Sequence, residues 1–220
     1  MGGGVRVRRI LDVLIPAGRI FGIFTNLEVE RVDNPSVVFA YQYFSWRQGP
    51  ECGAKGLVLI EDARGHVTHF VALSGFSFAP AMDTTDLPGG FAEVDEQGVK
   101  GMIARFDKEI REELGVEDLK IKRVISLGSY HPDRGLTNES PELFAAVIDA
   151  STAERIPVGQ WRNPDPFEMR SVPNVLPIDK LWGPTGALMT STDGFLQACV
   201  ARLVAIGEIS PPNATTKQAD

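Results

Sequence analysis

Three glutamates in one short run are the residues of this chain whose types and spacing point most directly to chemistry. Glu109, Glu112 and Glu113 all stand within residues 108–116. On a helix, which turns by about 100° per residue, their carboxylates would share one flank of the apolar stripe. Mg²⁺ takes one or two carboxylates, keeps several waters and uses its remaining positions for phosphate oxygens. The run therefore favours a site where a divalent cation holds a phosphate.

The same run has a second interpretation. A charged run on a helix usually marks a face in contact with solvent, and Lys108 and Arg111 would neutralise part of it. The turn upstream, Leu-Pro-Gly-Gly-Phe at 87–91, favours the metal site instead. Gly89 and Gly90 carry no side chain, so the backbone there can approach a phosphate or a metal closely.

Turn and run together resemble the Nudix box of diphosphate hydrolases. The box reads Gly, five residues, Glu, seven residues, then Arg-Glu-apolar-x-Glu-Glu-x-Gly-apolar. The matching positions are Gly90, Glu96, Glu109, Ile110, Glu112, Glu113, Gly115 and Val116. Two features differ: Lys108 replaces the Arg, and eleven rather than seven residues separate Glu96 from Lys108. Four extra residues are about one helical turn, so they either lengthen the helix and keep its facing or lengthen the loop.

The resemblance implies a role for each matching residue. Glu109, Glu112, Glu113 and the carbonyl of Gly89 would be ligands of Mg²⁺, or of Mn²⁺, with Glu112 and Glu113 central to catalysis. Gly90 shapes the loop, and Gly90 and Lys108 would lie against the substrate. In this family, water attacks a phosphorus of a nucleoside diphosphate linked to another moiety, and the products here would be a nucleoside monophosphate and a sugar phosphate.

A second segment resembles the ADP-ribose and nucleotide-sugar pyrophosphatases of that family. Pro132 follows Val116 by sixteen residues, and a loop Glu139 precedes a strand that starts with Glu142. The resemblance makes Glu139 the general base, with Glu142 as the reserve candidate and a substrate contact. The other interpretation of this loop is a polar tip without catalytic work. The Arg common on the strand before the turn is missing from 71–76, and Asp86 stands before Leu-Pro in place of Glu.

The expected partners follow from the same resemblance. The N-terminal hairpins are similar to the element that packs against the second subunit in those homodimers, so we expect a homodimer that acts on a nucleoside diphosphate-linked small molecule. The alternative function is a Nudix-fold sensor that binds a nucleotide sugar without cleaving it.

Composition narrows the partners further. The chain has 220 residues and a net charge of −7, which disfavours association with nucleic acid or an anionic membrane. Two cysteines far apart, Cys52 and Cys199, are typical of reduced core thiols, and with no long apolar stretch this favours a cytoplasmic protein. Between 87 and 117 stand eight acidic and four basic residues, so the negative charge is concentrated where a cation would neutralise it.

The hydrophobic pattern predicts elements that would position these residues. Strands are expected at 21–24, 27–32, 37–44, 55–60, 66–73, 121–130, 143–148 and 167–172. A helix is expected over 102–114, ending at Gly115, and a second one is capped by Asp193 with the stripe Phe195, Leu196, Cys199, Leu203 and Ile206. This order indicates an α+β or α/β sandwich with helices on a mixed sheet. Together with the resemblance it implies an α+β fold, an α/β/α sandwich on a Nudix-like mixed sheet, with an N-terminal antiparallel β element. The expected division is 1–50 for that element, 51–209 for the hydrolase domain and 210–220 for a disordered tail.

Overall fold

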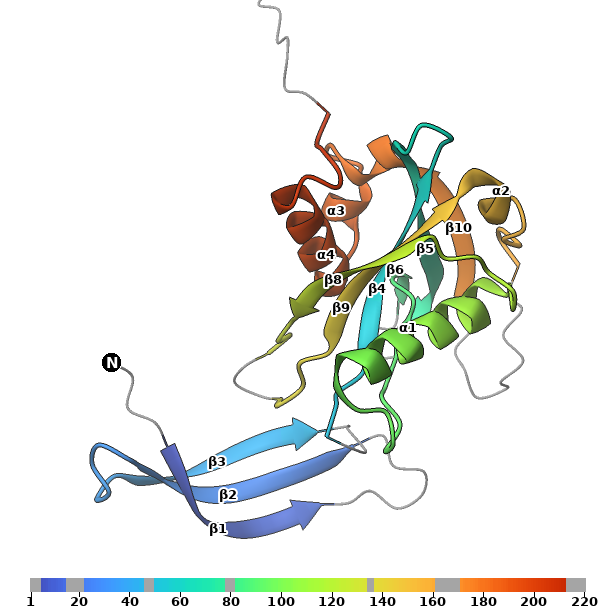
Figure 1. Ribbon diagram of the computed structural model, residues 1–220. Coiled ribbons are helices and arrows are strands. Elements are labelled where there is room, and N and C mark those ends of the chain that lie inside the picture. The colour runs from blue at the N-terminus through green and yellow to red at the C-terminus, as the bar shows by residue number, and fades with distance from the viewer. Residues whose placement is uncertain are drawn as a thin grey trace, which may run out of the picture.

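The computed structural model describes residues 5–14, 22–45, 50–77, 82–133, 137–160 and 171–212. Its N-terminal part is a three-stranded antiparallel sheet, set apart from the rest of the molecule (Figure 1). The strands are β1 (Val5–Leu14), β2 (Ile23–Arg31) and β3 (Val38–Ser45), with β2 in the centre. The turn predicted between the last two strands lies at residues 32–37.

A seven-stranded sheet forms the centre of the molecule. Its strands are β4 (Ala54–Glu61), β5 (Val67–Ser77), β6 (Met82–Asp86), β7 (Gly89–Gly90), β8 (Arg123–Ser129), β9 (Glu142–Asp149) and β10 (Ser171–Pro177). The order is β10-β5-β4-β9-β8, with β6 beside β5 and β7 beside β4. Strands β4 and β9 are parallel and the other pairs are antiparallel, so the sheet is mixed.

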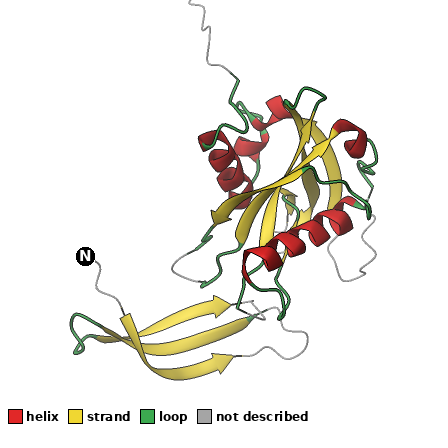
Figure 2. Cartoon of the chain, viewed as in Figure 1, coloured by secondary structure: helices red, strands yellow, loops and turns green. Residues whose placement is uncertain are grey.

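Helices cover both faces of this sheet (Figure 2). They are α1 (Gly98–Leu114), α2 (Ala150–Ala153), the 3₁₀ turn η1 (Ile178–Leu181), α3 (Ala187–Thr190) and α4 (Gly194–Ala205). Helix α1 packs on one face, and α4 packs on the other. The expected α+β fold, with a mixed sheet and a separate antiparallel element, is therefore confirmed.

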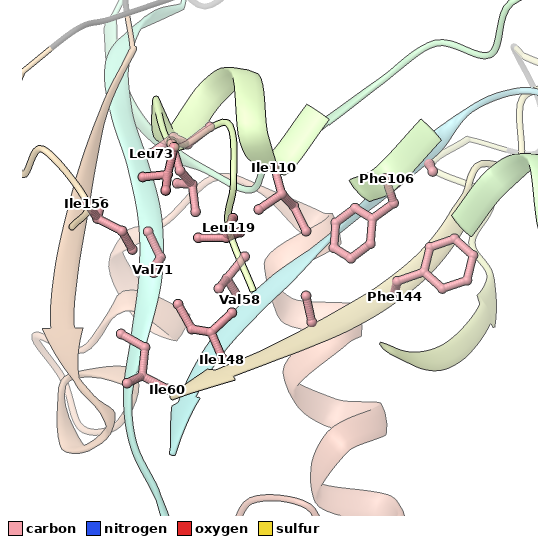
Figure 3. Packing of buried hydrophobic residues seen from close by; sticks show 14 of the residues in the cluster. Val58, Ile60, Val71, Leu73, Phe106, Ile110, Leu119, Phe144, Ile148 and Ile156 are labelled. Atoms are coloured by element: carbon pink, nitrogen blue, oxygen red, sulfur yellow. The ribbon is translucent and has the colours of Figure 1, made fainter. Parts of the chain in front are cut away.

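The two faces have separate cores because side chains alternate along each strand. On β4, Val58 and Ile60 pack toward α1, whereas Leu57 and Leu59 pack toward α4. On the α1 side, Phe106 stacks on a ring from β9, Phe144, with centroids 5.5 Å apart (Figure 3). This buried contact fixes the helix that carries the three glutamates against the central strands.

The start of helix α1 shows whether the four extra residues between Glu96 and Lys108 lie in the helix or in the loop before it. The expected helix over 102–114 is confirmed, but it begins earlier, at Gly98. The residues between Glu96 and Lys108 are therefore helical from Gly98 onward, and the insertion lengthens the helix instead of the loop. The helix ends as predicted, at a left-handed Gly115 with φ of 66°.

Three expectations about local structure were wrong. The two pieces expected at 21–24 and 27–32 form one strand, β2 (Ile23–Arg31), paired along its length with β3, and residue 21 lies outside the described residues. The last strand of the large sheet, expected at 167–172, extends to Pro177, and residues 167–170 lie outside the described residues. It contains Pro173 and Pro177, which an edge strand tolerates because one of its sides has no ladder partner. Ile206 does not join the buried stripe of α4, because the helix ends before it and its side chain is 56% exposed.

Both cysteines are free thiols buried in the structure, as expected. In the part of the chain that the structure describes, no helix combines the length and the apolar character needed to cross a membrane.

Candidate functional site

The Gly-Gly turn and the glutamate helix are joined by a direct hydrogen bond. The backbone N–H of Gly89 donates to Oε2 of Glu113 at 2.9 Å. Beside it, a Cβ on Gly90 would lie 2.2 Å from Oε1 of Glu109. The carboxylate of Glu109 therefore occupies the space that any side chain at position 90 would need. The structure brings Gly89, Gly90, Glu109 and Glu113 together, from segments about twenty residues apart.

The environment of Glu113 shows how these carboxylates affect each other. Burial raises the pKa of Glu113 well above its usual value, and the charge of Glu109 raises it further. The hydrogen bond from Gly89 and the charge of Lys55 oppose this shift. A carboxylate held in such a place prefers a proton or a cation, because its negative charge is poorly solvated.

These residues fit a Mg²⁺ ion by the chemistry of their donors. Glu109 and Glu113 supply two carboxylates beside the turn, and Mg²⁺ needs only one or two, together with water and phosphate oxygens. Within the described ranges, no group of three His, Cys, Asp or Glu side chains is already arranged as a complete cation cage. The remaining ligands would come from outside the side chains, as the preference of Mg²⁺ for water and phosphate allows.

Two of the predicted residues are more exposed than Glu109 and Glu113. The side chains of Glu112 and Lys108 are exposed on α1. Their positions leave both open to solvent and to a ligand approaching the helix from that side.

Arg105 places a guanidinium between Glu109 and two glutamates that precede α1. Its Nη2 lies 2.6 Å from Oε1 of Glu109, and its Nη1 lies 3.3 Å from Oε1 of Glu93 and 3.9 Å from Oε1 of Glu96. The side chains of Arg105 and Glu109 are each 11% exposed, so their contact is shielded from water, whereas Glu93 is 54% exposed. Arg105 stands one helical turn before Glu109, in the segment that contains the insertion; the i,i+4 spacing was the signal that could have revealed it.

The two candidates for a general base have different surroundings. Glu139 is fully buried, and its Oε1 accepts a hydrogen bond from Oγ of Ser45 at 2.7 Å, at the end of β3. Its backbone N–H donates to Oγ1 of Thr137 at 2.8 Å. Glu142 begins β9 and is half-buried. Alternation along β9 puts it on the α1 face with Phe144, and in the sheet it is paired with Ala54, the partner of Gly90.

A pocket of about 190 Å³ opens beside the turn. It is lined by Cys52, Ala54, Lys55, Gly89, Gly90, Phe91, Pro141 and Phe195. Lys55 faces Gly89 across the sheet, and its Nζ lies 2.5 Å from Oδ1 of Asp86 and 4.9 Å from the centre of the Phe195 ring. Lys55 was missed from the sequence, because only the pairing of β4 with β7 brings it to the turn, and Phe195 was missed because it comes from α4.

Comparison with known proteins supports the fold. No family model matches this chain, and no curated protein sequence matches it. Among solved structures, one described as "Crystal structure of ADP compounds hydrolase" matches over 94% of this chain and 100% of the other. The two chains share a fold. Their TM-score is 0.52 and their sequences are 13% identical, so the likeness concerns architecture and leaves the chemistry to the residues of this chain.

Proposed function

We propose that this protein is a Mg²⁺-dependent hydrolase that cleaves the diphosphate of a nucleoside diphosphate linked to another moiety, ADP-ribose or a nucleotide sugar. The observation that carries the proposal is the meeting of Glu109 and Glu113 at the Gly89–Gly90 turn. The fold shared with an ADP compounds hydrolase supports it. The products would be a nucleoside monophosphate and a sugar phosphate.

The residues of the turn and the helix would have two different roles, binding the metal and leaving room for the substrate. Glu109, Glu113, the neighbouring Glu112 and the carbonyl of Gly89 would hold Mg²⁺, with Mn²⁺ as a substitute. When bound, the metal polarises phosphoryl oxygens and lowers the pKa of the attacking water. Gly90 keeps the backbone open to the substrate, because a side chain there would displace Glu109.

Protein groups also have to orient the water and the substrate. Glu139 would accept the proton of the attacking water, and Glu142 is the alternative acceptor and a substrate contact. A general base must come within hydrogen-bonding reach of that water once the substrate is bound. Lys108, exposed on α1, would contact the substrate from the solvent side.

A homodimer is part of this proposal. Strand β1 is exposed along its whole length, and its apolar side chains include Ile10 and Leu14, 63% and 57% exposed. A second copy of the chain would cover such a surface, since exposed apolar patches commonly mark interfaces. Light scattering tests this: Ile10→Asp should yield monomer, whereas the control Ile206→Asp, on another exposed apolar residue, should leave the dimer intact. A monomeric wild-type protein would contradict it.

The reaction itself is tested with a panel of ADP-ribose, NADH, nucleotide sugars, dinucleoside polyphosphates and nucleoside triphosphates, each with Mg²⁺. We expect release of nucleoside monophosphate from ADP-ribose or a nucleotide sugar, and loss of that release with EDTA. Binding of ADP-ribose, seen as a thermal shift, without any released phosphate ester would replace the hydrolase by the sensor.

A further inference from the structure

Two aspartates meet beside the Gly89–Gly90 turn, and the proposed reaction uses neither of them. Asp86 is the last residue of β6, and Asp193 is the residue before α4. Their carboxyl groups share a hydrogen bond. Next to this contact, Oγ of Ser191 donates to the carbonyl of Thr85 at 3.0 Å. The segment before α4 is therefore attached to the strand that leads into the turn.

Asp86 also contacts the start of the turn and the neighbouring strand β4. Its Oδ1 accepts a hydrogen bond from the N–H of Leu87 at 2.7 Å, and the same oxygen lies 2.5 Å from Nζ of Lys55. Lys55 is paired with Gly89 across the sheet, and the N–H of Gly89 is bound to Glu113. A displacement of Asp86 would therefore move the turn that is bonded to Glu113.

The surroundings of Asp193 favour its protonated form. Its Oδ1 accepts a hydrogen bond from the N–H of Phe195 at 2.8 Å, whereas Oδ2 is buried and accepts none from any residue that the structure describes. A buried carboxylate oxygen without a donor is unfavourable. Burial raises the pKa of Asp193 to about 7 against the charge of Lys55, and the contact with Asp86 raises it further. A proton on Asp193 supplies the donor for its hydrogen bond with Asp86.

Asp86 keeps its negative charge beside this proton. Burial would raise its pKa, but the charge of Lys55 and the hydrogen bond from Asp193 outweigh burial and lower it. The side chain of Asp86 is 45% exposed, so its charge remains partly solvated. Burial would lower the pKa of Lys55, but the charges of the two aspartates outweigh burial and raise it. With one proton on the aspartates the cluster is neutral, and without that proton it carries one negative charge.

Other titratable groups face this cluster from the elements packed around it. They are Glu113 on α1, Cys199 on α4 and Tyr130 after β8, whose hydroxyl lies beside Gly194. Burial raises the pKa of Cys199 to about 12, so this thiol stays neutral near pH 7. Burial and the charge of Glu109 raise the pKa of Glu113, which lies on the other side of the turn. Variants that leave Glu113 unchanged separate its proton from that of Asp193.

We propose that the cluster of Asp86, Lys55 and Asp193 positions the Gly-Gly turn, and that it does so only while the two aspartates share one proton. Loss of the proton places two carboxylates side by side, and their repulsion separates the start of α4 from the end of β6. The turn follows directly after Asp86, so its contact with Glu113 would loosen as well. The expected effect on turnover rests on the proposed function, whereas the coupling between proton and turn does not.

The first test follows the turn itself in a pH titration of the full chain by NMR spectroscopy. In the wild type, the amide signals of Leu87 and Gly89 should shift in a step near pH 7. Asp193→Asn cannot ionise, and its amide can donate to Asp86 as the protonated acid does, so this step should be lost. Asp179→Asn, on an exposed aspartate of η1, is the matched control and should keep the step. Absence of the step in the wild type, or an unchanged step in Asp193→Asn, would overturn the inference.

The second test is the pH profile of kcat with ADP-ribose and Mg²⁺. A group whose pKa is about 7 is about nine-tenths protonated at about pH 6 and about one-tenth protonated at about pH 8. The ratio of kcat in Asp193→Asn to kcat in the wild type should therefore rise about tenfold over this range. The ratio cancels the titration of groups that both proteins share, Glu113 included. A ratio that stays constant with pH is what a merely structural Asp193 would give, and it would contradict the proposed positioning.

The two tests separate this inference from the proposed function. A wild type that hydrolyses no member of the substrate panel contradicts the proposed function, while the step at Leu87 and Gly89 still decides the inference. Should Asp193→Asn not fold, Asp86→Asn is titrated in the same way. Asp193 then faces Lys55 without a second carboxylate, so the step should move to lower pH, and a step that stays near pH 7 would overturn the inference.

Discussion

The N–H of Gly89 donates a hydrogen bond to the carboxylate of Glu113, and this contact joins the Gly-Gly turn to helix α1. The bond crosses from the sheet to α1, so the position of the turn depends on the helix. Because Gly89 also pairs with Lys55 on β4, one short strand links a glutamate on one side of the sheet to a lysine on the other. A substitution of either Glu113 or Lys55 should therefore change the position of this turn.

Replacement of Gly90 by Ala should reduce activity through Glu109. The added Cβ would lie 2.2 Å from Oε1 of Glu109, so the carboxylate must move away from the turn. We expect kcat to fall by about tenfold or more, as when the support of a metal ligand is lost. Gly65→Ala is the control: nothing lies within 4 Å of the new Cβ, but the φ of 80° strains it, so stability should fall and kcat should not. Equal kcat in both variants would contradict the account.

Arg105 should behave as a positioning residue for Glu109. Arg105→Met removes both branches of the guanidinium, and the carboxylates of Glu93, Glu96 and Glu109 are then left without their shared cation. We expect kcat to fall by about ten- to a hundredfold with little change in KM, and Arg105→Lys to restore only part of it. The check is steady-state kinetics over a range of Mg²⁺ concentrations. An unchanged kcat in Arg105→Met would show that Glu109 holds its position without this contact.

The candidates for the general base can be separated by substitution. Glu139→Gln should lower kcat by about 10²–10⁴-fold, since a positioned base contributes that much. Ser45→Ala should lower it less, because it removes only the hydrogen bond that holds Oε1 of Glu139. Glu142→Gln should act mainly on KM. If Glu142→Gln gives the larger loss in kcat, the base is Glu142 and Glu139 serves to attach its loop to β3.

Sequence reasoning found the elements whose pattern is local. The stripe of apolar residues and the terminal Gly115 were enough to place α1, and short apolar runs were enough to place β4 and β9. Strand β1 was not predicted, because it is exposed on both faces and its apolar residues do not separate from its charged ones. The expected last strand ended too early, at 172, because Pro173 and Pro177 are unusual inside a strand, although the edge of a sheet accepts them.

The candidate site was predictable only where its residues lie in one motif. Glu109, Glu112 and Glu113 stand close together in the chain, so their types and spacing could be interpreted directly. Lys55 is more than thirty residues from Gly89, and only the register of β4 with β7 makes them neighbours. Arg105 was hidden for a different reason: Lys108 occupies the expected position, and the extra helical turn presents a guanidinium one turn earlier.

The stability of the protein should depend on pH through Asp193. Burial raises its pKa to about 7, whereas the unfolded chain has the ordinary value of about 4. Between these values the folded state holds a proton that the unfolded state has lost, so this contribution to stability falls as pH rises toward 7. Asp193→Asn cannot ionise, yet it keeps an acceptor for the N–H of Phe195 at the start of α4. Melting curves from about pH 4 to about pH 8 should show a shallower decline in Tm for this variant; parallel curves would contradict the shift.

The most direct test of the hydrolase is the release of nucleoside monophosphate from ADP-ribose, with Mg²⁺, by the double variant Glu112→Gln/Glu113→Gln. Glu117→Gln is the matched control, because it removes a carboxylate just beyond α1 that has no proposed role. The account predicts that the wild type and the control release nucleoside monophosphate at similar rates. The double variant should lose nearly all turnover while its circular dichroism spectrum stays unchanged. A folded double variant with the wild-type rate would contradict the account.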